Sequence, residues 1–163
     1  MLFGKKEIIT RELDHVCKSG IRLHYLKTED GKPPLVLIHG QSMCRLDYGR
    51  VLPELSESFT VYALDCPGHG ESSRDVQSYT CRAVGDAVCD FIRSVTGECF
   101  LSGHSSGAII AAYAAGHEKS LVKALLLEDP PFFKVQPPEM ENTFVWKDSF
   151  AVNHGFLNQT EEK

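Results

Sequence analysis

The chain has 163 residues, of which 42% are hydrophobic and 24% charged, and its formal net charge is -5 at pH 7. These values are typical of one soluble globular domain. Acidic and basic residues alternate without a basic stripe, and the longest apolar stretch, residues 105–115, is too short to span a bilayer, so we predict neither a nucleic-acid partner nor a membrane association.

The first predicted elements are a hairpin and a buried strand. Residues 13–17 and 21–26 flank a Ser-Gly turn, and the second segment alternates apolar and polar side chains, as a half-buried strand does. Residues 35–38 are apolar at every position, which indicates a strand that is covered on both faces.

Helices and strands then alternate along the rest of the chain. We predict helices at residues 46–55, 79–95 and 108–116, and strands at residues 59–64, 99–101 and 122–127. The last of these strands is again apolar enough to be buried. This alternation predicts an α/β fold with a mostly parallel sheet and helices on both faces.

Four loops with polar residues or glycines follow the predicted parallel strands. They are His39-Gly40, residues 65–72, residues 103–107 and Glu128-Asp129. In sheets of this kind, ligands and catalytic groups gather at the carboxyl ends of the strands. The shared position of the four loops therefore predicts one site at that edge of the sheet.

The cysteines carry no metal or disulfide pattern. None of the six forms a Cys-x-x-Cys motif, no two histidines have zinc spacing, and residues 1–14 lack the apolar core of a signal peptide. We therefore predict reduced and mostly buried thiols, no metal, no cofactor and a cytoplasmic protein. The six are Cys17, Cys44, Cys66, Cys81, Cys89 and Cys99.

The hairpin and the loops, in this order, resemble the α/β-hydrolase superfamily. Gly103-His104-Ser105-Ser106-Gly107 is similar to the nucleophile elbow of its serine members, a tight strand-to-helix turn. The resemblance covers about residues 12–133 and implies an α/β-hydrolase fold that is truncated after about strand six. Residues 1–133 would be the amino-terminal part of the core, and residues 134–163 the incomplete start of a cap or connecting segment.

The resemblance implies roles for the residues of the elbow and of the loop after residue 38. Ser105 would be the nucleophile, and glycines at 103 and 107 would leave room for the sharp turn. The backbone N–H groups of Ser106 and Gln41 would form the oxyanion hole. Two alternatives stay open. Ser105 could be an ordinary helix N-cap residue, and His39 could transfer protons instead of shaping the loop. The supporting residues are His39, Gly40, Gly103, His104 and Gly107.

A catalytic acid and a histidine should follow Ser105 in the chain. Glu128 and Asp129 end the last predicted strand, and at most one of them would point toward the site. Asp129 is the candidate acid, with a turn toward a cap as the alternative. His117 would lie about 18 Å from Ser105 along one helix, at about 1.5 Å per residue, which excludes it. Only His154 remains, in a segment that resembles the start of a cap. A helix start at residues 160–163 strengthens the expectation that the histidine belongs to a longer chain.

The sequence thus predicts a serine hydrolase that acts on a small-molecule ester or other acyl compound through an acyl-enzyme on Ser105, with its active site incomplete in this chain. The alternative is a non-catalytic binding protein or an inert fragment of such an esterase-like enzyme. Strand 122–127 would then be an exposed apolar edge, and the chain could self-associate through it.

Overall fold

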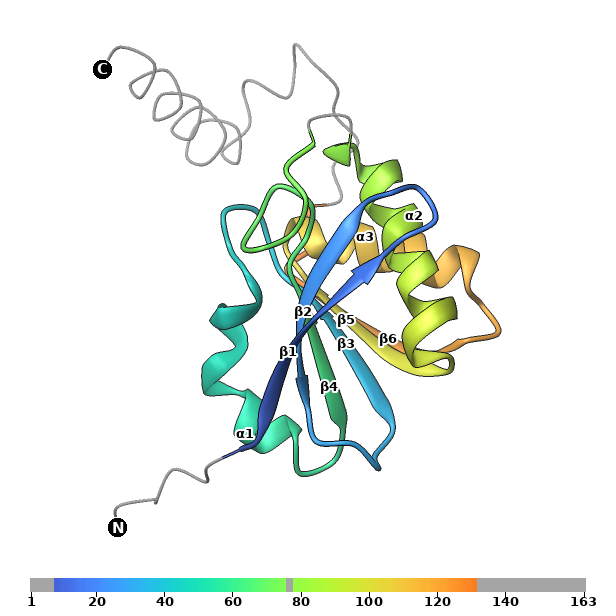
Figure 1. Cartoon of the computed structure of the whole chain (residues 1–163). Coiled ribbons are helices and arrows are strands. Elements are labelled where there is room, and N and C mark those ends of the chain that lie inside the picture. Colours follow the sequence, from blue (N-terminus) through green and yellow to red (C-terminus); the bar gives the residue numbers. More distant parts are fainter. Residues whose placement is uncertain (1–7, 76–77, 132–163) are drawn as a thin grey trace, which may run out of the picture. The chain divides into compact units, whose positions relative to one another are not determined.

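The computed structural model describes residues 8–75 and 78–131 (Figure 1). His154 and the whole segment 134–163 lie outside the described residues. The strands are β1 (Thr10–Val16), β2 (Arg22–Thr28), β3 (Pro34–Ile38), β4 (Thr60–Leu64), β5 (Cys99–His104) and β6 (Val122–Glu128). The helices are a 3-10 helix η1 (Arg45–Arg50), α1 (Leu52–Leu55), α2 (Cys81–Phe91), a π-helical turn η3 (Ile92–Thr96) and α3 (Ser106–His117).

The six strands form one mixed sheet in the order β1-β2-β4-β3-β5-β6. β1 and β2 form the predicted antiparallel hairpin, and β2 is also antiparallel to β4. β4, β3, β5 and β6 are mutually parallel, which confirms the predicted fold class. Ile38 pairs with both Leu64 and Gly103, so the loops after β3, β4 and β5 leave from the same edge of the sheet.

Helices lie on both faces of the sheet (Figure 1). One face, which includes Val36, Ile38, Leu64 and Leu101, packs against α2 and α3, and all four side chains are nearly inaccessible to solvent. The alternate residues of the same strands point the other way. Leu35, Leu37, Val61 and Ala63 pack against Leu52 of α1 and the neighbouring η1.

Two elements differ from the expectations. The helix predicted at residues 46–55 is divided into η1 and the short α1, with Pro53 at the start of α1. Proline has no N–H and its ring collides with the preceding turn, so one continuous α-helix through Pro53 is unfavourable. The apolar run predicted that strand 122–127 is buried, which is wrong for the described residues: Leu126 of β6 is 57% exposed. This exposure agrees with the other expectation, an exposed apolar edge. Apolar composition favours burial, but the neighbouring elements decide it.

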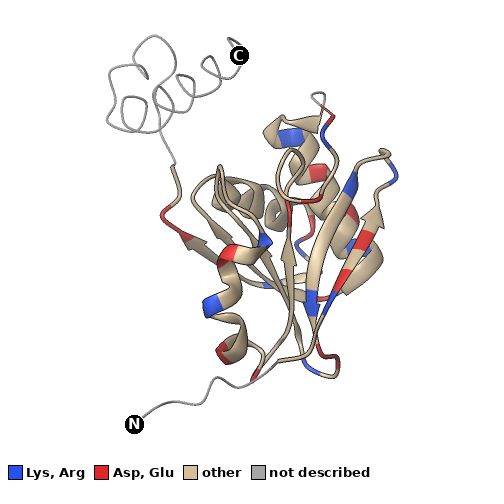
Figure 2. Cartoon of the chain, turned by 60° about the vertical axis from the view of Figure 1, so that its left-hand side comes forward, with Lys and Arg blue, Asp and Glu red and all other residues tan. Residues whose placement is uncertain are grey.

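The six cysteines are all free, and four of them are buried. Burial raises the pKa of the Cys66 thiol to about 12 and that of the Cys89 thiol to about 11, so both stay protonated at neutral pH. Charged residues of both signs are interspersed along the described elements (Figure 2). No helix of the described part is both long and apolar enough to cross a bilayer.

Candidate active site

The turn between β5 and α3 has the geometry of a nucleophile elbow. Ser105 has φ 53° and ψ -121°, a conformation that non-glycine residues rarely adopt and that costs on the order of 1–3 kcal/mol. It occupies the N-cap position of α3, yet its hydroxyl makes no capping hydrogen bond. The side chain is half-buried. An ordinary N-cap would use its hydroxyl on the helix, so the strained turn calls for another explanation.

The two glycines of the elbow are required by close backbone contacts. A Cβ on Gly103 would lie 2.3 Å from the carbonyl oxygen of Gly107, and a Cβ on Gly107 would lie 2.3 Å from the carbonyl oxygen of Ile38. Both distances are far below van der Waals contact. The turn is therefore open only to glycine at these positions, as the sequence predicted from sterics.

The loop after β3 lies against the elbow. A Cβ on Gly40 would meet the Ser105 Cβ at 3.1 Å and the His104 Nδ1 also at 3.1 Å. That Nδ1 is buried without a hydrogen-bond partner in the described part of the chain. Gln41, the next residue, is exposed, and Ser106 is the first residue of α3. The predicted oxyanion residues thus belong to two segments that meet at Ser105.

His39 is buried and fixes the start of this loop. Its Nε2 accepts a hydrogen bond from the Cys66 N–H at 2.9 Å, and its Nδ1 lies 2.7 Å from the Gly40 carbonyl oxygen. Nε2 as acceptor leaves the proton on Nδ1, so the ring is neutral. Burial lowers the pKa of His39, which favours the same state. These contacts use both ring nitrogens on the backbone and support a role in shaping the loop.

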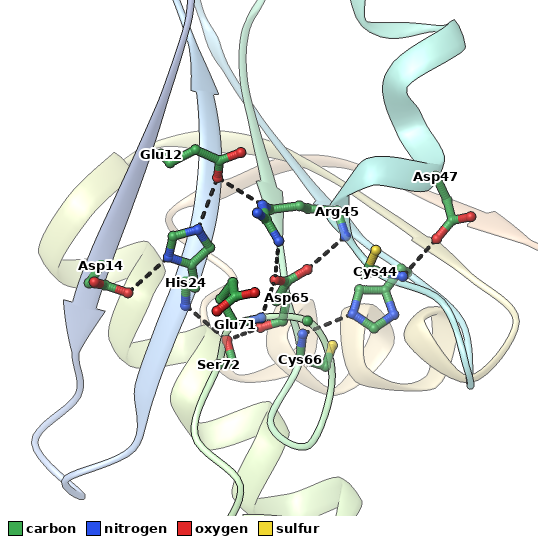
Figure 3. A network of polar contacts seen from close by, with 12 residues as sticks. Glu12, Asp14, His24, Cys44, Arg45, Asp47, Asp65, Cys66, Glu71 and Ser72 are labelled. Atoms are coloured by element: carbon green, nitrogen blue, oxygen red, sulfur yellow. Dashed lines mark hydrogen bonds and ion pairs between the residues drawn. The ribbon is translucent and has the colours of Figure 1, made fainter.

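Sequence reasoning assigned no role to Asp65, which is fully buried directly after β4. Its carboxylate accepts hydrogen bonds from the Arg45 N–H and Nη1, each at 2.7 Å, and from the Glu71 N–H at 2.9 Å (Figure 3). A Cβ on Gly70 would lie 1.9 Å from its Oδ2. A carboxylate at the end of an entirely buried strand was the available signal, because such a charge requires partners.

The network around Asp65 continues to β1 and β2. Arg45 Nε also donates to the Glu12 carboxylate at 2.7 Å, and the His24 ring nitrogens lie 3.0 Å from the carboxylates of Glu12 and Asp14 (Figure 3). The hydrogen bond with His24 lowers the pKa of Asp14. Since Arg45 begins η1 directly after the loop that follows β3, the network ties this loop to the hairpin and to the loop after β4.

The end of β6 reaches the elbow through its backbone. The Ser105 N–H donates to the Glu128 carbonyl oxygen at 2.8 Å. The predicted acid Asp129 follows at φ 47° and is exposed. Within the described residues no hydrogen bond joins Asp129 to a histidine, and none joins a histidine to the Ser105 hydroxyl. His117 lies at the end of α3, whereas Ser105 precedes its first residue, and the His117 Nδ1 lies 2.8 Å from the Tyr113 carbonyl oxygen.

A mostly apolar groove of about 580 Å³ runs along the sheet face opposite α2 and α3. It extends from α1 to His104 and Glu128. The groove lies on the sheet face beside η1 and α1, and Tyr48, Val51 and Leu55 line one side of it. Its lining includes Leu35, Leu37, Met43, Phe100 and Leu126.

The mostly parallel sheet, the strained serine turn and the Gly40 loop beside it are the features of an α/β hydrolase. The chain belongs to the Alpha/beta hydrolase family, which matches residues 35–158. This confirms the resemblance read from the sequence motifs.

Relatives of this chain carry different activities in their names. It is 31% identical over 143 residues to the soluble epoxide hydrolase of Corynebacterium sp., covering 86% of this chain and 48% of that protein. It is 32% identical over 119 residues to the N-formylmaleamate deformylase of Pseudomonas putida, covering 72% and 44%. The chain thus spans about half the length of these relatives.

The structural likeness has the same extent. The epoxide hydrolase CorEH superposes with a TM-score of 0.74 at 26% identity, covering 90% of this chain and 50% of that one. The N-formylmaleamic acid deformylase of Pseudomonas putida gives a TM-score of 0.71 at 26% identity, covering 83% and 53%.

Proposed function

We propose that Ser105 is the nucleophile of an acyl-transfer hydrolase. Its hydroxyl oxygen attacks a carbonyl carbon, the leaving group departs with a proton, and water then hydrolyses the resulting acyl-enzyme ester. The observation that carries the proposal is the strained Ser105 turn between β5 and α3, with a free hydroxyl and two glycines that admit no side chain. The amino end of α3 favours negative charge beside the reacting oxygen.

The backbone N–H groups of Gln41 and Ser106 are the proposed oxyanion donors. Gly40 lies in contact distance of Ser105, so the loop that carries Gln41 borders the nucleophile. The Ser105 N–H is already bound to Glu128 and is not available for this task. Loss of one such donor typically lowers turnover by about 10²–10³. His39 and Asp65 support these donors by holding the loop through buried hydrogen bonds.

A serine nucleophile favours a small-molecule acyl substrate over an epoxide, although relatives of both kinds occur. Attack on a carbonyl gives an ester that water can cleave, which regenerates the serine. Attack on an epoxide carbon would leave an ether on Ser105, and water does not readily cleave an ether. A catalytic cycle on Ser105 therefore requires an ester or another acyl compound.

Asp129 is the proposed acid that orients the histidine. It follows Glu128, whose carbonyl oxygen holds the Ser105 N–H, so this end of β6 lies next to the nucleophile. Among the described residues, no histidine is hydrogen-bonded to the Ser105 hydroxyl, so the proton acceptor is not in this part of the chain. We propose that activity requires a histidine from outside residues 8–131.

A fluorophosphonate probe, with intact mass as the readout, tests the nucleophile. We expect slow single labelling of the 163-residue chain, loss of the label in Ser105→Ala, and an unchanged label in Ser94→Ala, which alters an exposed serine of η3. Labelling that survives Ser105→Ala would contradict the proposal. Labelling within seconds at pH 7 would show that a base is already present. Loss of this rapid labelling in His154→Ala would identify His154 as that base.

Self-association is the second candidate function, because β6 is an edge strand with an exposed apolar surface. Leu125 and Leu126 are 38% and 57% exposed, and β6 pairs only with β5 among the described strands. Such an edge can pair with a second chain. Light scattering of the 163-residue chain and of Leu126→Lys tests this, since a charged side chain on the edge should shift the population toward monomers.

A further inference from the structure

A histidine, a cysteine and a carboxylate converge where the β1–β2 hairpin packs against α2. His15 lies near the end of β1, Cys17 follows that strand, and Asp90 lies in the last turn of α2. Their ligand atoms all lie within 4.8 Å of one another. None of the three belongs to the loops around Ser105. The sequence showed no zinc spacing because 72 residues lie between Cys17 and Asp90 in the chain.

The three side chains of the cluster are largely buried, and they face one another. Cys17 is 4% exposed and Asp90 is 5% exposed, whereas the His15 ring keeps some access to solvent. His15 Nε2 lies 3.0 Å from Asp90 Oδ2, and the Cys17 Sγ makes only a long contact of 3.7 Å to the Ala87 carbonyl oxygen. The ring of His15 also packs edge-on against Phe91, which fixes its position.

We propose that His15, Cys17 and Asp90 form a binding site for a borderline-soft divalent cation of the zinc class. Thiolate, imidazole and carboxylate are the three ligand types that zinc takes in proteins, whereas calcium and magnesium prefer oxygen alone. Around tetrahedral zinc these atoms stand about 3.3–3.6 Å apart, so side-chain shifts on the order of 1 Å bring the three ligand atoms to these distances. Water reaching the site past His15 supplies the fourth ligand.

The charge balance of the bound site suits a buried position. Binding deprotonates the Cys17 thiol and releases that proton to solvent, while His15 coordinates through Nε2 as a neutral ring. One thiolate and one carboxylate then neutralise the two positive charges of the cation, so no net charge is buried. The cation replaces the hydrogen bond between His15 and Asp90 and joins the hairpin to α2, which stabilises the folded chain.

Metal titration of the reduced, metal-stripped 163-residue chain tests this site. We expect one equivalent of Co²⁺ to give a thiolate-to-metal charge-transfer band, Zn²⁺ to displace it, and Zn²⁺ to raise the melting temperature. Cys17→Ser and Asp90→Asn should weaken Zn²⁺ binding by more than the roughly 10–100-fold that loss of a supporting contact costs. Cys81→Ser, which alters an exposed cysteine at the start of α2, should bind as the parent chain does.

Each other outcome overturns the proposal. They are an absent charge-transfer band in the parent chain, Zn²⁺ binding that is unchanged in Cys17→Ser, and an equal loss in Cys81→Ser. Because the band and the melting shift are measured on the parent chain, the test holds even where Asp90→Asn fails to fold. Circular dichroism of each variant separates lost binding from lost structure. No outcome depends on hydrolase activity, so the metal-site proposal is tested independently of the proposed function.

Discussion

β5 and β6 are neighbouring parallel strands of one sheet, and they lead to opposite halves of the candidate site. β5 is buried along most of its length and runs into the strained Ser105 turn. β6 is exposed along most of its length and ends at the exposed Asp129. The proposed nucleophile Ser105 therefore lies in a packed part of the molecule, and the candidate acid lies on an open edge of its described part.

The difference shows how each half is held. Around Ser105, the backbone is held in one conformation. It is fixed by the close contacts of the glycines, by the buried His39 and by the hydrogen bonds of Asp65. At the end of β6, the Ser105 N–H is held by the Glu128 carbonyl oxygen, a backbone group that any residue would supply. We therefore expect substitutions on the β5 side to be costly and equivalent substitutions on the β6 side to be nearly neutral.

Gly107→Ala should have the largest effect. The new Cβ would lie 2.3 Å from a backbone carbonyl oxygen, so the elbow has to shift, and we expect a loss of more than about 4 kcal/mol in the free energy of unfolding. Gly116→Ala, near the other end of α3, meets nothing within 4 Å and should stabilise the helix by about 0.5–1 kcal/mol. Urea denaturation measures both; a loss below 1 kcal/mol in Gly107→Ala would show that the elbow can relax.

Two carboxylates that follow strands give the next contrast. Asp65→Asn leaves the Arg45 guanidinium without its buried partner and should cost about 3–5 kcal/mol. Asp129→Asn alters an exposed side chain and should stay within about 0.5 kcal/mol, because asparagine tolerates the positive φ of this residue. Thermal unfolding at equal protein concentration compares them. A large cost for Asp129→Asn would show that this carboxylate has a buried partner.

Two leucines on the adjacent strands test the packing directly. Leu101→Ala removes a fully buried side chain of β5 and should cost about 3 kcal/mol. Leu126→Ala removes a side chain of β6 that is 57% exposed and should cost less than about 1 kcal/mol. Urea denaturation of both variants measures the two losses in the free energy of unfolding. Equal losses would break the comparison and show that other residues cover β6.

The smallest expected effect is a pH dependence that comes from His39. Burial places its folded-state pKa below the ordinary value, so the folded state binds fewer protons than the unfolded state. Stability is then complete above about pH 6.5 and falls as pH drops through the folded-state pKa. His39→Gln should flatten this decline below about pH 6.5 in denaturation curves. An unchanged decline would assign it to other groups.

Sequence patterns predicted much of this molecule where local rules suffice. Residues 35–38 formed the expected strand, and the glycines at 103 and 107 were expected from the sterics of a tight turn. The division of the helix at Pro53 could have been foreseen from the ring of proline. The role of Arg45 could not, because its partner Asp65 is 20 residues away and nothing local joins them.

The sequence by itself determined the order of strands and helices, the serine turn and the family, because periodicity, apolar runs and glycine spacing are local properties of the chain. The tertiary structure alone decided which carboxylate is buried, and that His15, Cys17 and Asp90 meet. Burial and convergence depend on which elements pack together, and that is a property of the whole fold.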